Sequence, residues 1–158
     1  MSQWGSTRTQ LIICAGQSER WAGGQRVRLF LDANVLISAS WKEESRVIRL
    51  WRIPGTELVT SNLVIDECER NLFALHQSER LRQLLSGVRV LHFERTPRME
   101  NLPPLSEKDR HVFAAAVLAR ADYLVTGDRR HFGLCYGTSI LRIRVEPPGR
   151  FPKVLEEA

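Results

Sequence analysis

The sequence predicts an α/β fold, with three αβα layers and a central, mostly parallel sheet of about five strands. Short apolar runs alternate along the chain with segments of helical periodicity, which is typical of a parallel sheet covered by helices on both faces. With 158 residues, 43% of them hydrophobic, the chain can build one substantial core. We therefore expect one domain at residues 26–146, preceded by an N-terminal extension of undetermined order (1–25) and followed by a C-terminal tail (147–158).

Strands are expected where short runs rich in Val, Leu, Ile and Phe are bounded by turn-forming residues. The first is RVRLFLD at residues 26–32, whose composition is typical of a buried strand. The others are ELVTS, VRVLHF, DYLVT and SILRIRV, at residues 57–61, 88–93, 122–126 and 139–145.

Helices are expected between these strands. The first is a short amphipathic helix whose apolar residues share one face. Ser61 or Asn62 is expected to cap the second. Ser106 has an acid, Asp109, three residues later, and this capping box predicts the start of the third. The three helices are placed at residues 40–51, 63–76 and 109–121.

Composition narrows the classes of function. The formal net charge of +5 comes mainly from arginine, whose planar guanidinium suits phosphate, although such a charge also simply keeps a small protein in solution. The three cysteines are widely spaced among apolar residues, which argues against a disulfide framework or a thiol metal site. Apolar runs fall short of the roughly 20 residues that would cross a bilayer, so we expect a cytoplasmic protein with no membrane partner.

Four acidic residues stand where a predicted strand ends or a predicted helix begins: Asp32, Glu67, Asp109 and Asp128. The carboxyl ends of parallel strands are where ligands collect in open α/β sheets. If the strands before Asp32 and Asp128 are neighbours, the roughly 4.8 Å strand spacing brings both carboxylates within reach of one small cation. Oxygen donors without His or Cys suit Mg²⁺ or Mn²⁺ rather than zinc.

Each acid also has a plain structural interpretation. Asp32 and Asp128 could be turn residues or caps, and Asp109 could serve only in its capping box. Glu67 lies in a run of charged residues, which on a helix is usually a solvated face. What favours function is that all four share one edge of one predicted sheet.

The motifs around these acids resemble those of PIN-domain ribonucleases, of the kind found as toxins in VapC-type toxin–antitoxin pairs. LFLDANVLISA is similar to the first motif, with Asp32 as the first metal-binding acid, and SNLVIDECERNL is similar to the second, with Glu67. DRHVFAAAVLARADYLVTGDRRHF resembles the third and fourth motifs, with Asp109 and Asp128. The similarity runs over residues 26–132.

The resemblance implies a Mg²⁺- or Mn²⁺-dependent endoribonuclease that acts on single-stranded RNA. Asp32 and Asp128 would be the principal metal ligands, and Glu67 and Asp109 would complete the pocket directly or through water. Which acid accepts the proton of the attacking water stays open. The family also allows an antitoxin partner and a homodimer.

Other polar residues near the acids have expected supporting roles. Two of them, Asn34 and Thr126, can orient the metal ligands. Three that follow the last acid are expected to contact the RNA backbone: Arg129, Arg130 and His131.

The chain departs from the family pattern after Asp128, where relatives often carry another acid, so we do not expect a rich second-metal site. Two other classes of function stay open. An aspartyl-nucleophile phosphatase would usually want a second acid at position 34, where this chain has Asn34. A noncatalytic RNA-binding or protein-docking module could keep the acids as a pocket without turnover.

Overall fold

The computed structural model describes residues 26–102 and 104–157, so the N-terminal extension expected at 1–25 lies outside the described residues. Six strands form one sheet in the order β3-β2-β1-β4-β6-β5. Neighbouring strands are parallel except β5 and β6, so the predicted mostly parallel sheet is confirmed. The strands are β1 (Val27–Leu31), β2 (Thr56–Ser61), β3 (Val88–Leu91), β4 (Tyr123–Val125), β5 (Ser139–Ile140) and β6 (Ile143–Glu146).

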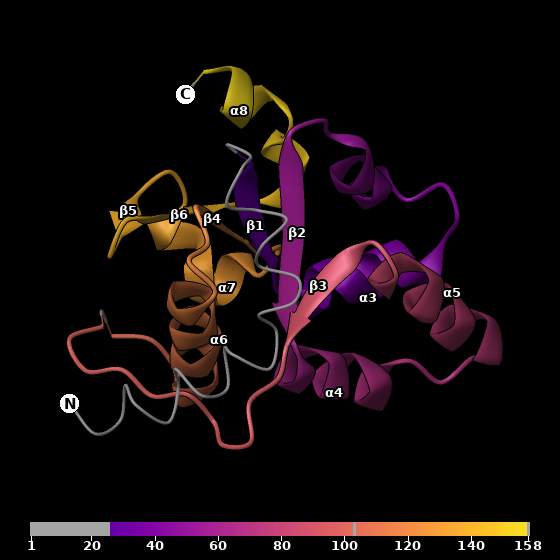
Figure 1. Ribbon diagram of the computed structural model, residues 1–158, viewed down its shortest axis with the longest axis horizontal. Coiled ribbons are helices and arrows are strands. Elements are labelled where there is room, and N and C mark those ends of the chain that lie inside the picture. The colour runs from indigo at the N-terminus through magenta and orange to yellow at the C-terminus, as the bar shows by residue number, and fades with distance from the viewer. Residues whose placement is uncertain (1–25, 103, 158) are drawn as a thin grey trace.

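Helices cover both faces of this sheet, as the predicted three-layer fold requires. Figure 1 shows α3, α4 and α5 on one side of the strands and α6 with α7 on the other. The α-helices are α3 (Ala33–Trp41), α4 (Asn62–Asn71), α5 (Leu75–Leu85), α6 (Glu107–Leu118), α7 (Arg129–Phe132) and α8 (Lys153–Glu156). Short 3₁₀ helices are η1 (Arg46–Arg52), η2 (Gly133–Cys135) and η3 (Pro148–Arg150).

The prediction of an α-helix at residues 40–51 is wrong. Helix α3 instead begins directly after Asp32, whose Oδ1 accepts a hydrogen bond of 2.8 Å from the backbone N–H of Ala33. The segment that was expected to be α-helical contains η1, which starts where the Ser45 hydroxyl accepts from the N–H of Val47. Because Asp32 caps it, the helix begins earlier in the chain than predicted, at residues to which the sequence pattern assigned no element.

Two further elements differ from prediction. The helix expected at 63–76 ends at Asn71, because Leu72 turns to an extended conformation and enters the core, and α5 then forms a separate helix. The single strand expected at 139–145 is a hairpin of β5 and β6. Leu141 and Arg142 form its turn with φ values of 50° and 69°, a left-handed geometry that the sequence did not signal.

The order of the strands reverses direction between β1 and β4, and the edge of the sheet at the carboxyl ends of these two strands is called the crevice below. From β1 the chain moves outward to β2 and β3, and it then returns to place β4 on the other side of β1. In such sheets ligands bind beside the carboxyl ends of the strands where the direction reverses. Leu31 pairs with Val125, so the strands that precede Asp32 and Asp128 are neighbours, which meets the condition for bringing their carboxylates close together.

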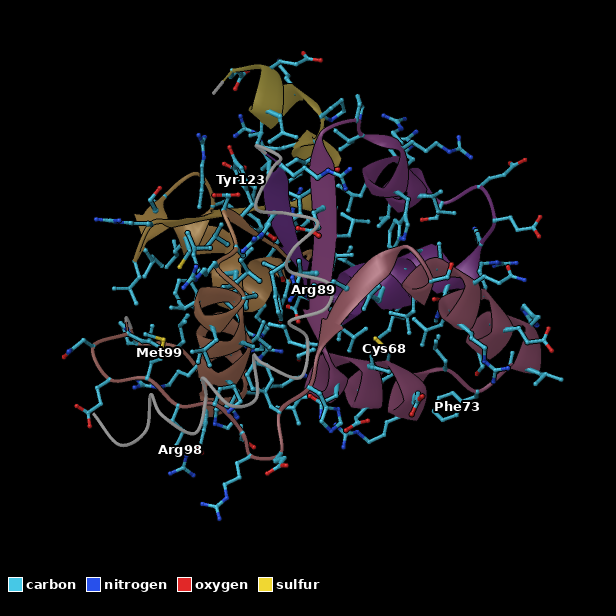
Figure 2. All side chains as sticks on the ribbon, viewed as in Figure 1. Cys68, Phe73, Arg89, Arg98, Met99 and Tyr123 are labelled. Atoms are coloured by element: carbon cyan, nitrogen blue, oxygen red, sulfur yellow. The ribbon has the colours of Figure 1, made fainter. Side chains whose placement is uncertain are left out.

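Apolar side chains fill the space between sheet and helices. Phe30, Leu31 and Leu124 are fully buried along the central strands. Cys68, a residue of α4, is buried in the core. Phe73 lies on the outer turn between α4 and α5 and is 90% exposed (Figure 2). Within residues 26–102 and 104–157, the helices are all too short or too polar to cross a membrane.

Candidate metal centre

Asp32 is held rigidly at the end of β1. Its Oδ1 accepts from the N–H of Ala33, and its Oδ2 accepts from the Thr126 hydroxyl at 2.8 Å and from the Asn34 amide at 3.3 Å. The residue is only 6% exposed. The pKa of Asp32 is raised to about 6, mainly by burial and also by the negative charges of Glu67 and Asp109, while the donors from Thr126 and Ala33 offset part of the rise.

Asn34 and Thr126 join the ends of β1 and β4. The Asn34 amide donates to the Thr126 hydroxyl at 3.2 Å, and Asn34 Oδ1 accepts from the N–H of Gly127 at 2.7 Å. A Cβ atom at Gly127 would lie 3.3 Å from Asn34 Oδ1, so a side chain there would press on this contact. Both residues that were expected to orient the acids therefore lie against Asp32.

Asp128, His131 and Asp109 form a second, tighter group. Asp128 caps α7, where its Oδ1 accepts from the N–H of His131 at 3.2 Å and its Oδ2 lies 2.7 Å from His131 Nδ1. The same ring nitrogen lies 3.6 Å from Asp109 Oδ2. One potential ligand atom from each of the three residues lies within 4.8 Å of the others. The three side chains could therefore share one cation.

The groups around Asp109 and Asp128 stabilise their charges differently. Asp109 is buried in the first turn of α6, and its carboxylate accepts from the hydroxyl of the helix cap, Ser106. Partial burial alone would raise the pKa of Asp128, but the side-chain and backbone donors of His131 outweigh it and the pKa is lowered. Asp128 is therefore ionised through the neutral pH range.

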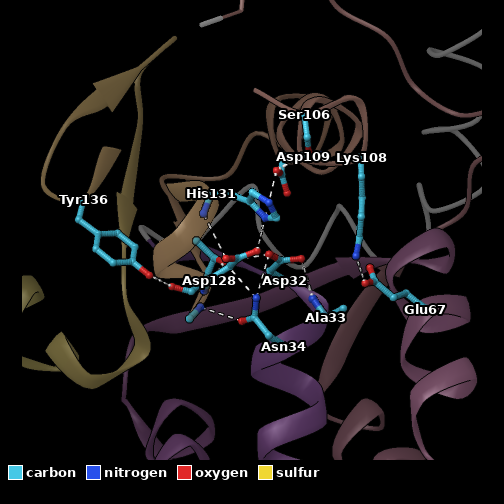
Figure 3. A network of polar contacts seen from close by, with 12 residues as sticks. Asp32, Ala33, Asn34, Glu67, Ser106, Lys108, Asp109, Asp128, His131 and Tyr136 are labelled. Carbon is cyan, nitrogen blue, oxygen red and sulfur yellow. Dashed lines mark hydrogen bonds and ion pairs between the residues drawn. The ribbon is translucent and has the colours of Figure 1, made fainter. Parts of the chain in front are cut away.

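Glu67 faces the same crevice from α4, where it forms an ion pair with Lys108 of α6 (Figure 3). The hydrogen bond to Glu67 raises the pKa of Lys108, burial lowers it, and the charges of Glu67, Asp32 and Asp109 raise it further. Sequence reasoning missed Lys108, although it lies directly before Asp109. The ion pair joins Lys108 to Glu67, which is far away in the chain, and the spacing of residues within one segment cannot predict such a contact.

The structure thus brings all four predicted acids to one crevice but gives them different contact partners. Asp109 and Asp128 join His131, whereas Asp32 is bound to Thr126 and Asn34, and Glu67 is bound to Lys108. The imidazole of His131, which is also expected to contact RNA, lies beside two acids, Asp109 and Asp128 (Figure 3). The two arginines of the expected RNA contact, Arg129 and Arg130, are exposed on α7.

The donor set fits a divalent cation. Two carboxylates, those of Asp109 and Asp128, lie close together with His131, and burial together with the charges of Glu67 and Asp109 raises the pKa of the neighbouring Asp32. A cation would relieve this repulsion. Asp109 and Asp128 are placed to hold it, with Asp32 and Glu67 at its border, and carboxylate oxygens are preferred by Mg²⁺ and Mn²⁺.

Comparisons with known proteins agree with this architecture. A PIN domain family model matches residues 28–130. A chain of VapBC2 from Rickettsia felis, solved bound to a DNA fragment from the VapBC2 promoter, has a TM-score of 0.58 at 17% identity and covers 77% of this chain and 98% of its own. Mycobacterium tuberculosis VapC20, a Sarcin-Ricin loop cleaving toxin, has a TM-score of 0.47 at 18% identity, with 73% and 98% covered.

None of the curated proteins compared with this sequence matches it. The family match nevertheless covers more than half of the chain and contains all four acids of the crevice. The resemblance inferred from the sequence motifs is therefore confirmed at the level of the family. This chain belongs to the PIN-domain family.

Proposed function

We propose that this protein is a metal-dependent endoribonuclease that hydrolyses phosphodiester bonds of single-stranded RNA, and that it is the toxin of a toxin–antitoxin pair. The observation that carries the proposal is the convergence of Asp32, Asp109 and Asp128, from three distant segments, at the switch point of a PIN-domain sheet. An antitoxin partner, a homodimer and a cytoplasmic location belong to the same proposal, and the likeness of the motifs to VapC-type toxins supports them.

The acids of the crevice would hold Mg²⁺ or Mn²⁺, chiefly through Asp109 and Asp128, with Asp32 and Glu67 beside them. When bound, such an ion supplies positive charge to the phosphate oxygens and lowers the pKa of a bound water. The protein contributes preorganisation, because the three donors to Asp32 fix its orientation before the substrate arrives. Either Glu67 or Asp109 would accept the proton of the attacking water.

Charge around the crevice supports an RNA substrate. Arg129 and Arg130 are exposed on α7, one and two residues beyond Asp128, where they can contact backbone phosphates in a salt-sensitive manner. An unpaired strand can bring its phosphates to the acids more easily than a stacked duplex. The side chain at position 34 disfavours the phosphatase alternative, because the amide of Asn34 is engaged with Asp32, Thr126 and Gly127.

Cleavage of a single-stranded RNA by the purified protein tests this proposal. We expect cleavage with Mg²⁺ or Mn²⁺, none with EDTA, and a loss of about 100-fold or more in Asp32→Asn and Asp128→Asn. Asp66→Asn is the matched control, since Asp66 is an exposed acid beside Glu67 and should retain full activity. Cleavage that resists EDTA, or full activity in both site variants, would falsify the mechanism. A folded, metal-binding protein without cleavage would favour the noncatalytic module.

A further inference from the structure

We propose that His131 is a direct ligand of the divalent cation, binding through Nδ1 beside the carboxylates of Asp109 and Asp128. A centre with this nitrogen ligand should prefer Mn²⁺ over Mg²⁺. The inference rests on the proposed function only in assuming that the same crevice binds a cation. It adds a role for a residue that is also expected to contact the RNA backbone because it follows Asp128.

The position of the imidazole carries the proposal. His131 Nδ1 lies 2.7 Å from Asp128 Oδ2 and 3.6 Å from Asp109 Oδ2, which places it between a carboxylate at the N-cap of α7 and one in the first turn of α6. Asp32 and Glu67 do not belong to this group within the described part of the chain. The imidazole therefore stands where a third ligand would complete one face of a metal site.

Local structure fixes the ring in this orientation. Asp128 accepts from the backbone N–H of His131 with one oxygen and contacts its ring with the other, so one side chain sets both the start of α7 and the direction of the imidazole. The next residue, Phe132, is fully buried and anchors the helix in the core. The His131 side chain is 47% exposed, so the ring contacts the acids with Nδ1 while remaining open to solvent.

Ligand chemistry gives the metal preference. Mg²⁺ strongly favours oxygen ligands and keeps much of its water, whereas imidazole nitrogen is a good ligand for divalent transition ions. Binding through Nδ1 requires a neutral imidazole with its proton on Nε2, so a proton held at Nδ1 in the metal-free protein leaves to solvent.

Two measurements on the full-length protein test the assignment. Pulsed electron paramagnetic resonance of the Mn²⁺-loaded wild type should show a ¹⁴N hyperfine coupling, and labelling the histidines with ¹⁵N should change it accordingly. Calorimetric titration of His131→Gln should show Mn²⁺ affinity reduced about 10- to 100-fold, with Mg²⁺ affinity changed by less than about threefold. His111→Gln is the control that should retain both the coupling and the Mn²⁺ affinity.

The outcomes separate this inference from the proposed function. Mn²⁺ binding without nitrogen coupling in the wild type overturns the role of His131 and leaves the ribonuclease proposal standing, as does a coupling that persists in His131→Gln. If neither ion binds the wild type, both proposals fall. The isotope experiment uses the unaltered protein, so a decision does not require that His131→Gln folds.

Discussion

The hydroxyl of Thr126 donates a hydrogen bond of 2.8 Å to Oδ2 of Asp32, across 94 positions of the sequence. The two residues follow β4 and β1, the strands on either side of the switch point. Both are buried, so this bond replaces water as a partner of the carboxylate. This one hydrogen bond therefore joins the ends of two neighbouring strands and also orients a predicted metal ligand.

Thr126→Val should therefore destabilise the protein. Valine has nearly the shape of threonine but cannot donate to Asp32, which would be left buried with one partner fewer. We expect a loss of about 1–3 kcal/mol in the free energy of unfolding, measured by urea denaturation in EDTA. Thr126→Ser keeps the hydroxyl and should recover most of the loss. A valine variant as stable as the wild type would show that the bond contributes nothing.

The pKa of Asp32 predicts an unusual pH dependence in the metal-free protein. Folding raises this pKa from 3.8 to about 6, so the folded state holds the proton more tightly than the unfolded chain. Raising the pH from about 4 to about 6 should therefore lower the free energy of unfolding by about 2 kcal/mol from this group, and a smaller loss should follow as the pH rises past 6. Urea denaturation in EDTA across this range measures the effect.

Asp32→Asn is the control for that measurement, because asparagine does not titrate. The wild type should lose stability relative to this variant as the pH rises from 4 to 6, whatever the other acids contribute to both proteins. Parallel pH profiles for the two proteins would contradict the assignment.

Lys108 should weaken metal binding. Its ammonium group is paired with Glu67 and lies in the field of Asp32 and Asp109, so it supplies positive charge that a divalent ion must compete with. Lys108→Met should increase Mn²⁺ affinity about three- to tenfold, a modest effect because the Lys108 side chain is 67% exposed. Calorimetry measures it, and Lys153→Met on α8 is the distant control. Unchanged or weaker binding would argue against competition.

Phe132 should anchor α7 and with it the site. It is fully buried directly after His131, and truncating a buried phenylalanine typically costs about 3–5 kcal/mol. We expect Phe132→Ala to lose stability in this range by urea denaturation and to bind Mn²⁺ more weakly, because α7 holds Asp128 and His131. Leu134→Ala is the matched control, since Leu134 is 98% exposed and its loss should be neutral. Equal stability of the two variants would contradict the anchoring role.

Local sequence was informative where one strong signal acted alone. The apolar run before Asp32 became β1, and the capping box at Ser106 became the start of α6. Prediction from local sequence failed where one residue had two competing preferences. Asp32 caps α3 as well as facing the crevice, and the buried Leu72 ends α4 because packing against the core outweighs helical periodicity.

The fold class and the family can be predicted from the sequence, because apolar alternation and four acids in recognisable motifs are properties of adjacent residues. Which groups meet in the site depends on the folded chain. The placement of His131 between Asp109 and Asp128, and of Lys108 against Glu67, follows from the strand order and from how α4, α6 and α7 pack around one edge of the sheet. Contacts between distant segments depend on chain topology, and no local pattern encodes a distance between side chains that are remote in sequence.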